Sequence, residues 1–191
     1  MLQRKIFLKK LILKYRTVVQ FVFLFLGSYV FLSFCYSKYI ELSKAIAYYP
    51  DFVTYYVAKQ SATIISALGY NAEIISNNPS AQLILSINGS YLATIIEGCN
   101  SISIIILFVS FIIAFSQNFK KTFLFILSGS FFIYIVNVIR IAILAVTLYN
   151  FPSQEKFLHG VVFPGIIYGM VFLLWMLWIR MFVSKNNSRY A

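Results

Sequence analysis

The sequence predicts a mainly α, polytopic membrane protein. We expect a bundle of about four transmembrane helices with both ends cytoplasmic, and a small extracytoplasmic insertion formed by a helix and a β-hairpin. Of the 191 residues, 61% are hydrophobic and only 11% are charged, whereas soluble domains have roughly 45–50% apolar and about 25% charged residues. With two Cys and one His, the chain cannot be a disulfide scaffold or a Cys/His metal module. We therefore predict a single membrane domain over residues 1–191, without a cofactor.

Four apolar runs are long enough to cross a bilayer, which requires about 20 residues at roughly 1.5 Å each. The runs are 17–36, 100–119, 122–141 and 160–182. A cleaved signal peptide fits the first run poorly, because the run is too long for a signal core and no small-residue cleavage site follows it. Pro164 leaves the start of the fourth span open, since proline is tolerated in a first helical turn but not deeper.

The basic residues orient these spans. The net charge is +11, and the whole excess lies in three short segments that flank apolar runs. These residues are Arg4, Lys5, Lys9, Lys10, Lys14 and Arg16, then Lys120 and Lys121, then Arg180, Lys185 and Arg189. Lys and Arg in short loops mark the cytoplasmic side. The charge therefore indicates membrane topology, and we expect the lipid bilayer, not a nucleic acid, as the partner that it reflects.

Residues 37–98, between the first two spans, differ in character and carry four of the five acidic residues. Apolar residues at helical spacing over 52–68 predict an amphipathic helix, which lies either on the membrane or on the bundle. Two short apolar segments, 83–87 and 91–96, flank Asn88–Gly89. This dipeptide is the strongest short signal for a hairpin. We predict a helix followed by a β-hairpin that leads directly into the second span.

Three chemically active side chains are expected at the outer ends of the spans. Cys99 begins the second span, and His159, the only histidine, precedes the fourth. Arg140 lies 18 residues after Thr122, which corresponds to about 27 Å along a helix. Ionisable residues inside or at the edge of a membrane are rare enough to be functional candidates. The predicted topology brings the thiol, the guanidinium and the imidazole to one surface.

These groups suit acyl transfer from an amide to a cysteine. A thiolate is a good nucleophile when a nearby cation or imidazole stabilises it. His159 can exchange a proton near neutral pH, and Arg140 can stabilise the thiolate or the oxyanion of a tetrahedral intermediate. Asn137 lies one helical turn before Arg140 and can orient it or donate to the substrate carbonyl. Glu97 and Asn100, which flank Cys99, are supporting candidates.

Each residue also has a structural interpretation. A Cys35–Cys99 disulfide would remove the nucleophile, Arg140 could extend to the interface, and His159 could simply be solvated. The chain would then be a non-catalytic membrane subunit that binds a partner transmembrane helix. A transporter is disfavoured because the polar groups cluster at one face and do not line a path across the bilayer. The sequence has no HExxH pattern, no phosphate-binding loop and no paired acids within a span.

The three motifs together resemble the exosortase/archaeosortase family. They are Glu97-Gly98-Cys99-Asn100 before one span, Asn137-Val138-Ile139-Arg140-Ile141 near the outer end of the next, and His159-Gly160 before the last. The short chain and the Glu-Gly-Cys-Asn form are most similar to the F-type exosortases of Bacteroidota. The chain departs from the commoner family pattern, in which a small residue and then Gly follow the Cys, because Asn100 and Ser101 stand there.

The resemblance implies a cysteine protease or transpeptidase of the bacterial cytoplasmic membrane, with its active site facing the periplasm. Cys99 would be the nucleophile, Arg140 the stabilising cation and His159 the general acid/base. The implied substrates are exported proteins with a C-terminal signal made of a short motif, one transmembrane helix and a basic tail. A small associated membrane protein is a further expected partner.

Overall fold

The computed structural model describes residues 15–43, 50–77, 82–116 and 118–183, without the side chains of His159, Phe182 and Val183. The predicted basic residues at 4, 5, 9, 10, 14, 185 and 189 lie outside this part of the chain. The elements, in chain order, are α2 (Arg16–Ser43), α3 (Phe52–Ala67), β1 (Ala72–Asn77), β2 (Gln82–Ile87), β3 (Ser90–Ile95), η1 (Glu97–Cys99), α4 (Ile102–Ala114), α5 (Phe119–Asn150), η2 (Pro152–Gln154), α6 (Glu155–Phe157), η3 (Leu158–Val162), α7 (Phe163–Trp178) and η4 (Ile179–Val183). The predicted mainly α membrane architecture is confirmed.

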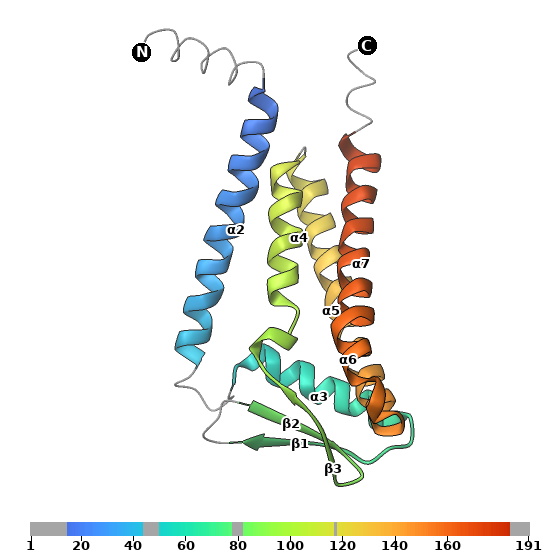
Figure 1. Cartoon of the computed structure of the whole chain (residues 1–191). Helices are drawn as coiled ribbons and strands as arrows, with labels where there is room; N and C mark the ends of the chain where they lie inside the picture. The colour runs from blue at the N-terminus through green and yellow to red at the C-terminus, as the bar shows by residue number, and fades with distance from the viewer. Residues whose placement is uncertain (1–14, 44–49, 78–81, 117, 184–191) are drawn as a thin grey trace, which may run out of the picture.

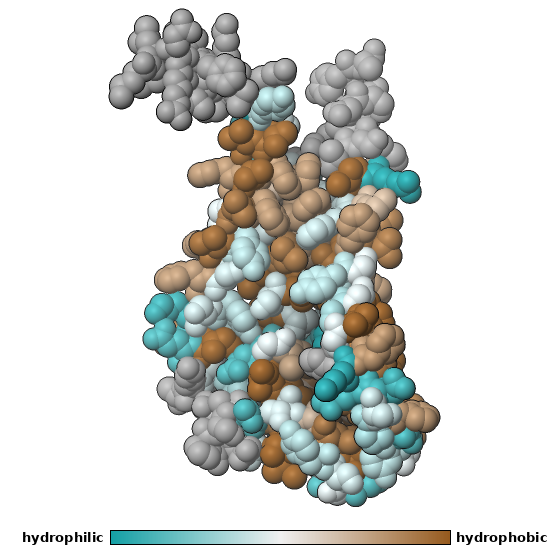
Figure 2. Space-filling view, in the orientation of Figure 1, coloured by the Kyte–Doolittle hydropathy of each residue, from teal (hydrophilic) through white to brown (hydrophobic). Residues whose placement is uncertain are grey.

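Among the described residues, three helical segments are long and apolar enough to cross a membrane. They are α2, α5 and the continuous stretch Pro152–Met181, with 28, 32 and 30 residues. The beginning of α2 and the end of η4 lie at one end of the bundle, and α3 and the sheet lie at the other (Figure 1). Hydrophobic residues cover much of the helical part, and many of the most hydrophilic residues gather around the insertion (Figure 2). This distribution is typical of a bundle that faces lipid along its length.

The expected span 100–119 is shorter in the structure. The helix α4 has 13 residues, fewer than the about 20 that a bilayer span needs. Two residues are lost at its start, where Ser101 has a φ of 64° and a left-handed residue cannot continue a helix. The backbone over 97–101 therefore forms a tight turn instead of the first turn of a span. Five are lost at its end, where α4 stops at Ala114 and α5 already begins at Phe119.

The helix α4 lies in the middle of the bundle and contacts α2, α5 and α7. Its Phe108 is fully buried in a cluster with Ile112, Ile133, Val171 and Trp178. The Phe108 ring lies directly over Gly129 of α5, where an added Cβ would be 2.7 Å from the ring atom Cε1. The close approach of α4 and α5 therefore depends on the missing side chain at Gly129.

The helix α3 begins where the Oδ1 atom of Asp51 accepts hydrogen bonds from the backbone N–H groups of Val53 (2.9 Å) and Thr54 (3.1 Å). This N-cap satisfies donors that have no partner inside the helix. Of the two predicted positions for this helix, the structure shows the one on the bundle. The hydroxyl of Ser61 donates to the carbonyl of Val138 in α5, at 3.3 Å.

The predicted hairpin is part of a three-stranded antiparallel sheet with the order β1-β2-β3. Asn88 and Gly89 form its turn with φ values of 51° and 78°, as a two-residue hairpin requires. The additional strand, β1, pairs Ala72 with Ile87 and Asn77 with Gln82. The β1 sequence, AEIISN, does not alternate strictly between apolar and polar residues, so it lacks the period-2 pattern that predicts a strand.

The inner face of the sheet packs on α3 and α5. The shared core contains buried side chains from all three elements, namely Val57, Ala58, Ala62, Ile65, Leu83, Leu85, Ile87, Ile95, Val138, Ile141, Ala142 and Ala145. Because β3 contacts α5 and then continues into η1, this core fixes the position of Cys99 relative to α5.

Candidate functional site

A cleft of about 670 Å³ lies between β3 and the C-terminal half of α5. Its volume is within the roughly 300–1,000 Å³ range of small-molecule and peptide-sized sites. Cys99, Arg140 and Glu155 are all among the residues that line it. The structure therefore brings together two of the three predicted catalytic residues, which are 41 positions apart in the sequence.

Cys99 is the last residue of η1. Its backbone N–H donates to the carbonyl of Ile96 at 2.8 Å, which closes a tight turn directly after β3. The residue is partly exposed and its thiol is free. Cys35, the other thiol, is also free and lies on the exposed surface of α2, so the alternative of a Cys35–Cys99 disulfide is not what the structure contains.

Asn137 links the cysteine turn to the arginine. Its Nδ2 atom donates to the carbonyl oxygen of Cys99 at 2.8 Å, and its Oδ1 atom accepts from Nη1 of Arg140 at 3.3 Å. The residue is 1% exposed, and buried amides are costly unless they are hydrogen-bonded on both sides. The Asn137 side chain therefore fixes the position of Cys99 relative to Arg140.

Arg140 is half-buried, and its guanidinium lies 5.9 Å from the ring centroid of Phe163 at the start of α7. This distance suits a cation–π contact. Its Nε atom is buried without a hydrogen-bond partner, and within the described residues no carboxylate pairs with it. A positive charge that is held in place but not neutralised remains available to an anionic group in the cleft.

Asn100 holds the cysteine turn from the other side. Its Nδ2 atom donates to the hydroxyl of Tyr36 at 2.8 Å and to Oγ1 of Thr54 at 3.0 Å. Its Oδ1 atom accepts from the N–H of Ile102, the first residue of α4, at 3.0 Å. Asn100 is 1% exposed and does not line the cleft. It ties α2, α3 and α4 together next to Cys99, and its expected supporting role stays a prediction.

Glu97 also lies outside the cleft lining. Its backbone carbonyl accepts a hydrogen bond from the Tyr36 hydroxyl at 3.2 Å. The acid that does line the cleft is Glu155 in α6, which the sequence reading did not single out. Glu155 could have been identified from its spacing, because it lies four residues before His159 and residues four apart are neighbours on a helix.

His159 lies in η3, a π-helical segment over Leu158–Val162 that follows α6 without a break. Its backbone is therefore about one turn beyond Glu155, at the edge of the cleft-lining segment. The side chain of His159 lies outside the described part of the structure, so its role stays a prediction. Among the described residues, no group of three or more His, Cys, Asp or Glu is placed to hold a metal ion.

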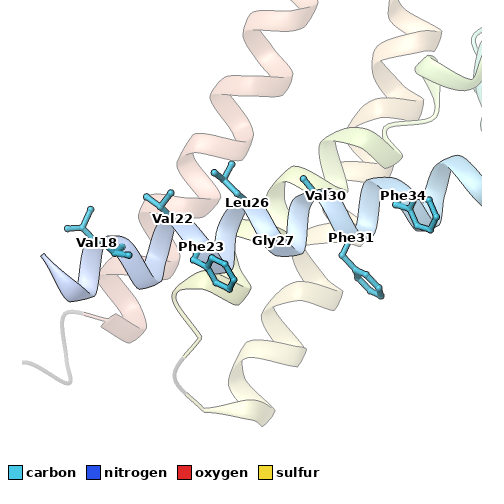
Figure 3. Close-up of a pocket in the computed structure, with 9 residues that line it drawn as sticks. Val18, Val22, Phe23, Leu26, Gly27, Val30, Phe31 and Phe34 are labelled. Carbon is cyan, nitrogen blue, oxygen red and sulfur yellow. The ribbon is translucent and has the colours of Figure 1, made fainter. Parts of the chain in front are cut away.

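A second hollow, of about 860 Å³, runs along α2 and has a different character. Figure 3 shows Val18, Val22, Leu26 and Val30 along one side of this helix and Phe23 and Phe31 along another. All the residues that line it come from α2, and none is polar. It is an apolar, lipid-compatible surface, and the chemical groups lie in the cleft at Cys99.

Comparison with known proteins identifies the family. The family model described as Transmembrane exosortase matches residues 15–179, most of the chain. No curated protein and no solved structure matches significantly. The matched region contains α2 to α7, together with Cys99, Arg140 and the backbone of His159. This chain therefore belongs to the transmembrane exosortase family, whose members are membrane-embedded protein-sorting enzymes.

Proposed function

We propose that the chain is a cysteine peptidase or transpeptidase that cleaves a C-terminal sorting signal of exported proteins at Cys99. The observation that carries this proposal is the bridge through Asn137, which joins the carbonyl of Cys99 to the guanidinium of Arg140 in one cleft. A buried amide that spans a thiol-bearing turn and an unneutralised arginine is what a positioned nucleophile requires.

The reaction follows from the groups in place. The thiolate of Cys99 attacks the carbonyl carbon of the substrate amide, and Arg140 stabilises the resulting oxyanion. His159 gives a proton to the leaving nitrogen as the C–N bond breaks, which leaves a thioester on Cys99. Water or an amine then attacks the thioester carbonyl, the C–S bond breaks and the thiol is restored. The two acceptors give hydrolysis and transpeptidation, respectively.

The expected substrate is an exported protein that ends in a short motif, a transmembrane helix and a basic tail. The cleft supports this assignment because it lies between β3 and α5, and β3 is at the insertion end of the bundle (Figure 1). The charge distribution supports a periplasmic position for that end, with the chain in the cytoplasmic membrane. The Glu97-Gly98-Cys99-Asn100 form still favours the F-type branch of the family.

The test is co-expression with a tagged candidate protein that carries such a tail. We expect processing to be lost with Cys99→Ala, Arg140→Ala and His159→Ala. Cys35→Ala is the matched control, because it removes the other thiol, which lies far along the chain on an exposed surface, and it should leave processing unchanged. Undiminished processing by Cys99→Ala would refute the mechanism.

The alternative, a non-catalytic subunit that binds a partner helix, makes an opposite prediction. Such a subunit should tolerate Cys99→Ser, which preserves size and polarity, whereas a thiol nucleophile should not. Labelling Cys99 with a membrane-impermeant thiol reagent on spheroplasts, in the Cys35→Ala background, checks the topology. Labelling from the outside is the expected result, and labelling only after permeabilisation would contradict it.

A further inference from the structure

The strand β3 has one unpaired edge, and this edge faces the cleft. Within the described residues β3 pairs with β2 alone. All six residues of β3, Ser90–Ile95, line the cleft. Side chains alternate between the two faces of a strand, so one face presents only every second residue. Because consecutive residues of β3 all line the cleft, the cleft lies along the edge of this strand. The free backbone N–H and C=O groups along this edge of β3 therefore border the cleft, which also reaches Leu85 on β2.

The opposite wall of the cleft comes from α5 and is mainly apolar. It contains Ile141, Leu144, Ala145 and Leu148. The cleft thus has a row of unpaired backbone groups on one side and an apolar helix on the other. This combination matches an extended peptide, whose main chain pairs with the edge while every second side chain meets the helix.

The edge also leads to the nucleophile. The strand ends at Ile95, and Cys99 follows after only three residues. Leu92 is an extra residue in the ladder, because Ala93 pairs with Leu85 while Tyr91 pairs with Ser86. This bulge breaks the edge into short stretches, which discourages uncontrolled pairing with long strands. After the bulge, Ala93–Ile95 pair regularly with β2, and this regular part of the strand is the part nearest the turn that carries Cys99.

We propose that the cleft binds the substrate segment before the cleaved bond as an added strand, paired with the free edge of β3 at Ala93–Ile95. This inference rests on the proposed function and specifies how the substrate of that site is recognised. Main-chain hydrogen bonds provide the affinity, and apolar side chains at alternating substrate positions contact α5.

The direction of the added strand follows from the fold. The strand β3 runs toward α4 and therefore toward the helical bundle. A segment that precedes a transmembrane helix also runs toward the membrane, so the two strands are parallel. Parallel pairing places the end of the recognised segment next to Cys99, where its last carbonyl can be attacked.

The first test is photocrosslinking in the Cys99→Ala protein, which needs no catalysis. A photoreactive phenylalanine replaces Tyr91 on β3, and the control replaces Ile75 on β1, at the opposite edge of the same sheet. These residues are 63% and 50% exposed, so both probes reach solvent. With the co-expressed tail-signal substrate we expect a crosslink from position 91 and not from position 75. Equal crosslinking from both positions, or none from 91, would overturn the inference.

The second test is a proline scan and an alanine scan of the substrate residues before the cleaved bond. Proline removes a backbone N–H, so it should block processing at alternating positions where alanine is tolerated. If Cys99→Ala abolishes processing but proline is tolerated throughout, the proposed function stands and strand pairing is wrong. If the unmodified substrate is not processed at all, the proposed function fails, and the crosslinking result decides on strand binding alone.

Discussion

Asn137→Ala should greatly reduce substrate processing without preventing the protein from folding. The change removes the 2.8 Å bond to the Cys99 carbonyl and the 3.3 Å bond from Arg140. A neutral hydrogen bond contributes about 0.5–1.5 kcal/mol and one to a charged group about 1.5–3 kcal/mol. Because the second bond is long, we take their sum as about 2–3 kcal/mol, which corresponds to a loss in rate of about 30- to 150-fold.

A second variant separates the two bonds. Asn137→Asp keeps an acceptor for Arg140 and makes that bond charge-assisted. It loses the donor to Cys99 and places a carboxylate oxygen against the backbone carbonyl. If Asn137 acts by positioning the cysteine turn, Asn137→Asp should be as defective as Asn137→Ala. If it served only to hold Arg140, the aspartate variant should lose less of the rate than Asn137→Ala, even though its carboxylate partly neutralises the guanidinium.

The assay is pulse-chase processing of the tagged substrate, at equal amounts of enzyme in the membrane. The matched control is Asn150→Ala, which removes the same kind of side chain from the same helix. Asn150 is exposed, bonds to the Val146 carbonyl at 2.8 Å and does not line the cleft. It should change the rate by no more than about twofold. A wild-type rate for Asn137→Ala would refute the positioning role.

Three further predictions concern the arginine, the helix packing and the cap of α3. Arg140→Lys keeps the charge but loses the planar group that bonds Asn137 and lies over Phe163, so processing should fall by about tenfold or more. A wild-type rate would show that charge alone suffices. Gly129→Val should separate α4 from α5, because the new side chain overlaps the Phe108 ring, with a loss of at least about 1–3 kcal/mol of stability. Gly129→Ala should be milder in the same thermal unfolding measurement, and equal stability of both variants with wild type would contradict the packing argument. Asp51→Ala removes a helix cap at a cost of about 0.5–2 kcal/mol, seen as a lower unfolding temperature, and Asp51→Asn, which retains the acceptor, should lose less.

Much of the fold could be predicted because its signals are local. Apolar composition identifies lipid as the solvent, and runs of about 20 apolar residues locate the long helices. The spacing over 52–68 predicts the helix observed at Phe52–Ala67, and Asn88–Gly89 predicts the observed turn. The exceptions are β1 and the shortness of α4. Both depend on pairing or backbone geometry that neighbouring residues do not determine.

The candidate site was only partly predictable. Cys99 and Arg140 were identifiable as polar interruptions next to apolar runs, and the structure places them in one cleft. Glu155, which lines the cleft, was not identified. Glu97, a supporting candidate, does not line the cleft, and its carbonyl accepts a hydrogen bond from Tyr36. The spacing of residues along a helix predicts which of them share a face. It does not predict which neighbouring element that face contacts.

The sequence by itself determined the solvent of this protein, the approximate extent of its long helices and the residue types that carry its chemistry, since all of these depend on composition and short-range order. Only the tertiary structure decided that Asn137 joins Cys99 to Arg140, that Asn100 binds Tyr36 and Thr54, and that the free edge of β3 opens into the cleft. These contacts join residues up to 64 positions apart. Such partners are selected by how helices and strands pack, because a buried polar group must find its hydrogen bonds wherever packing places them.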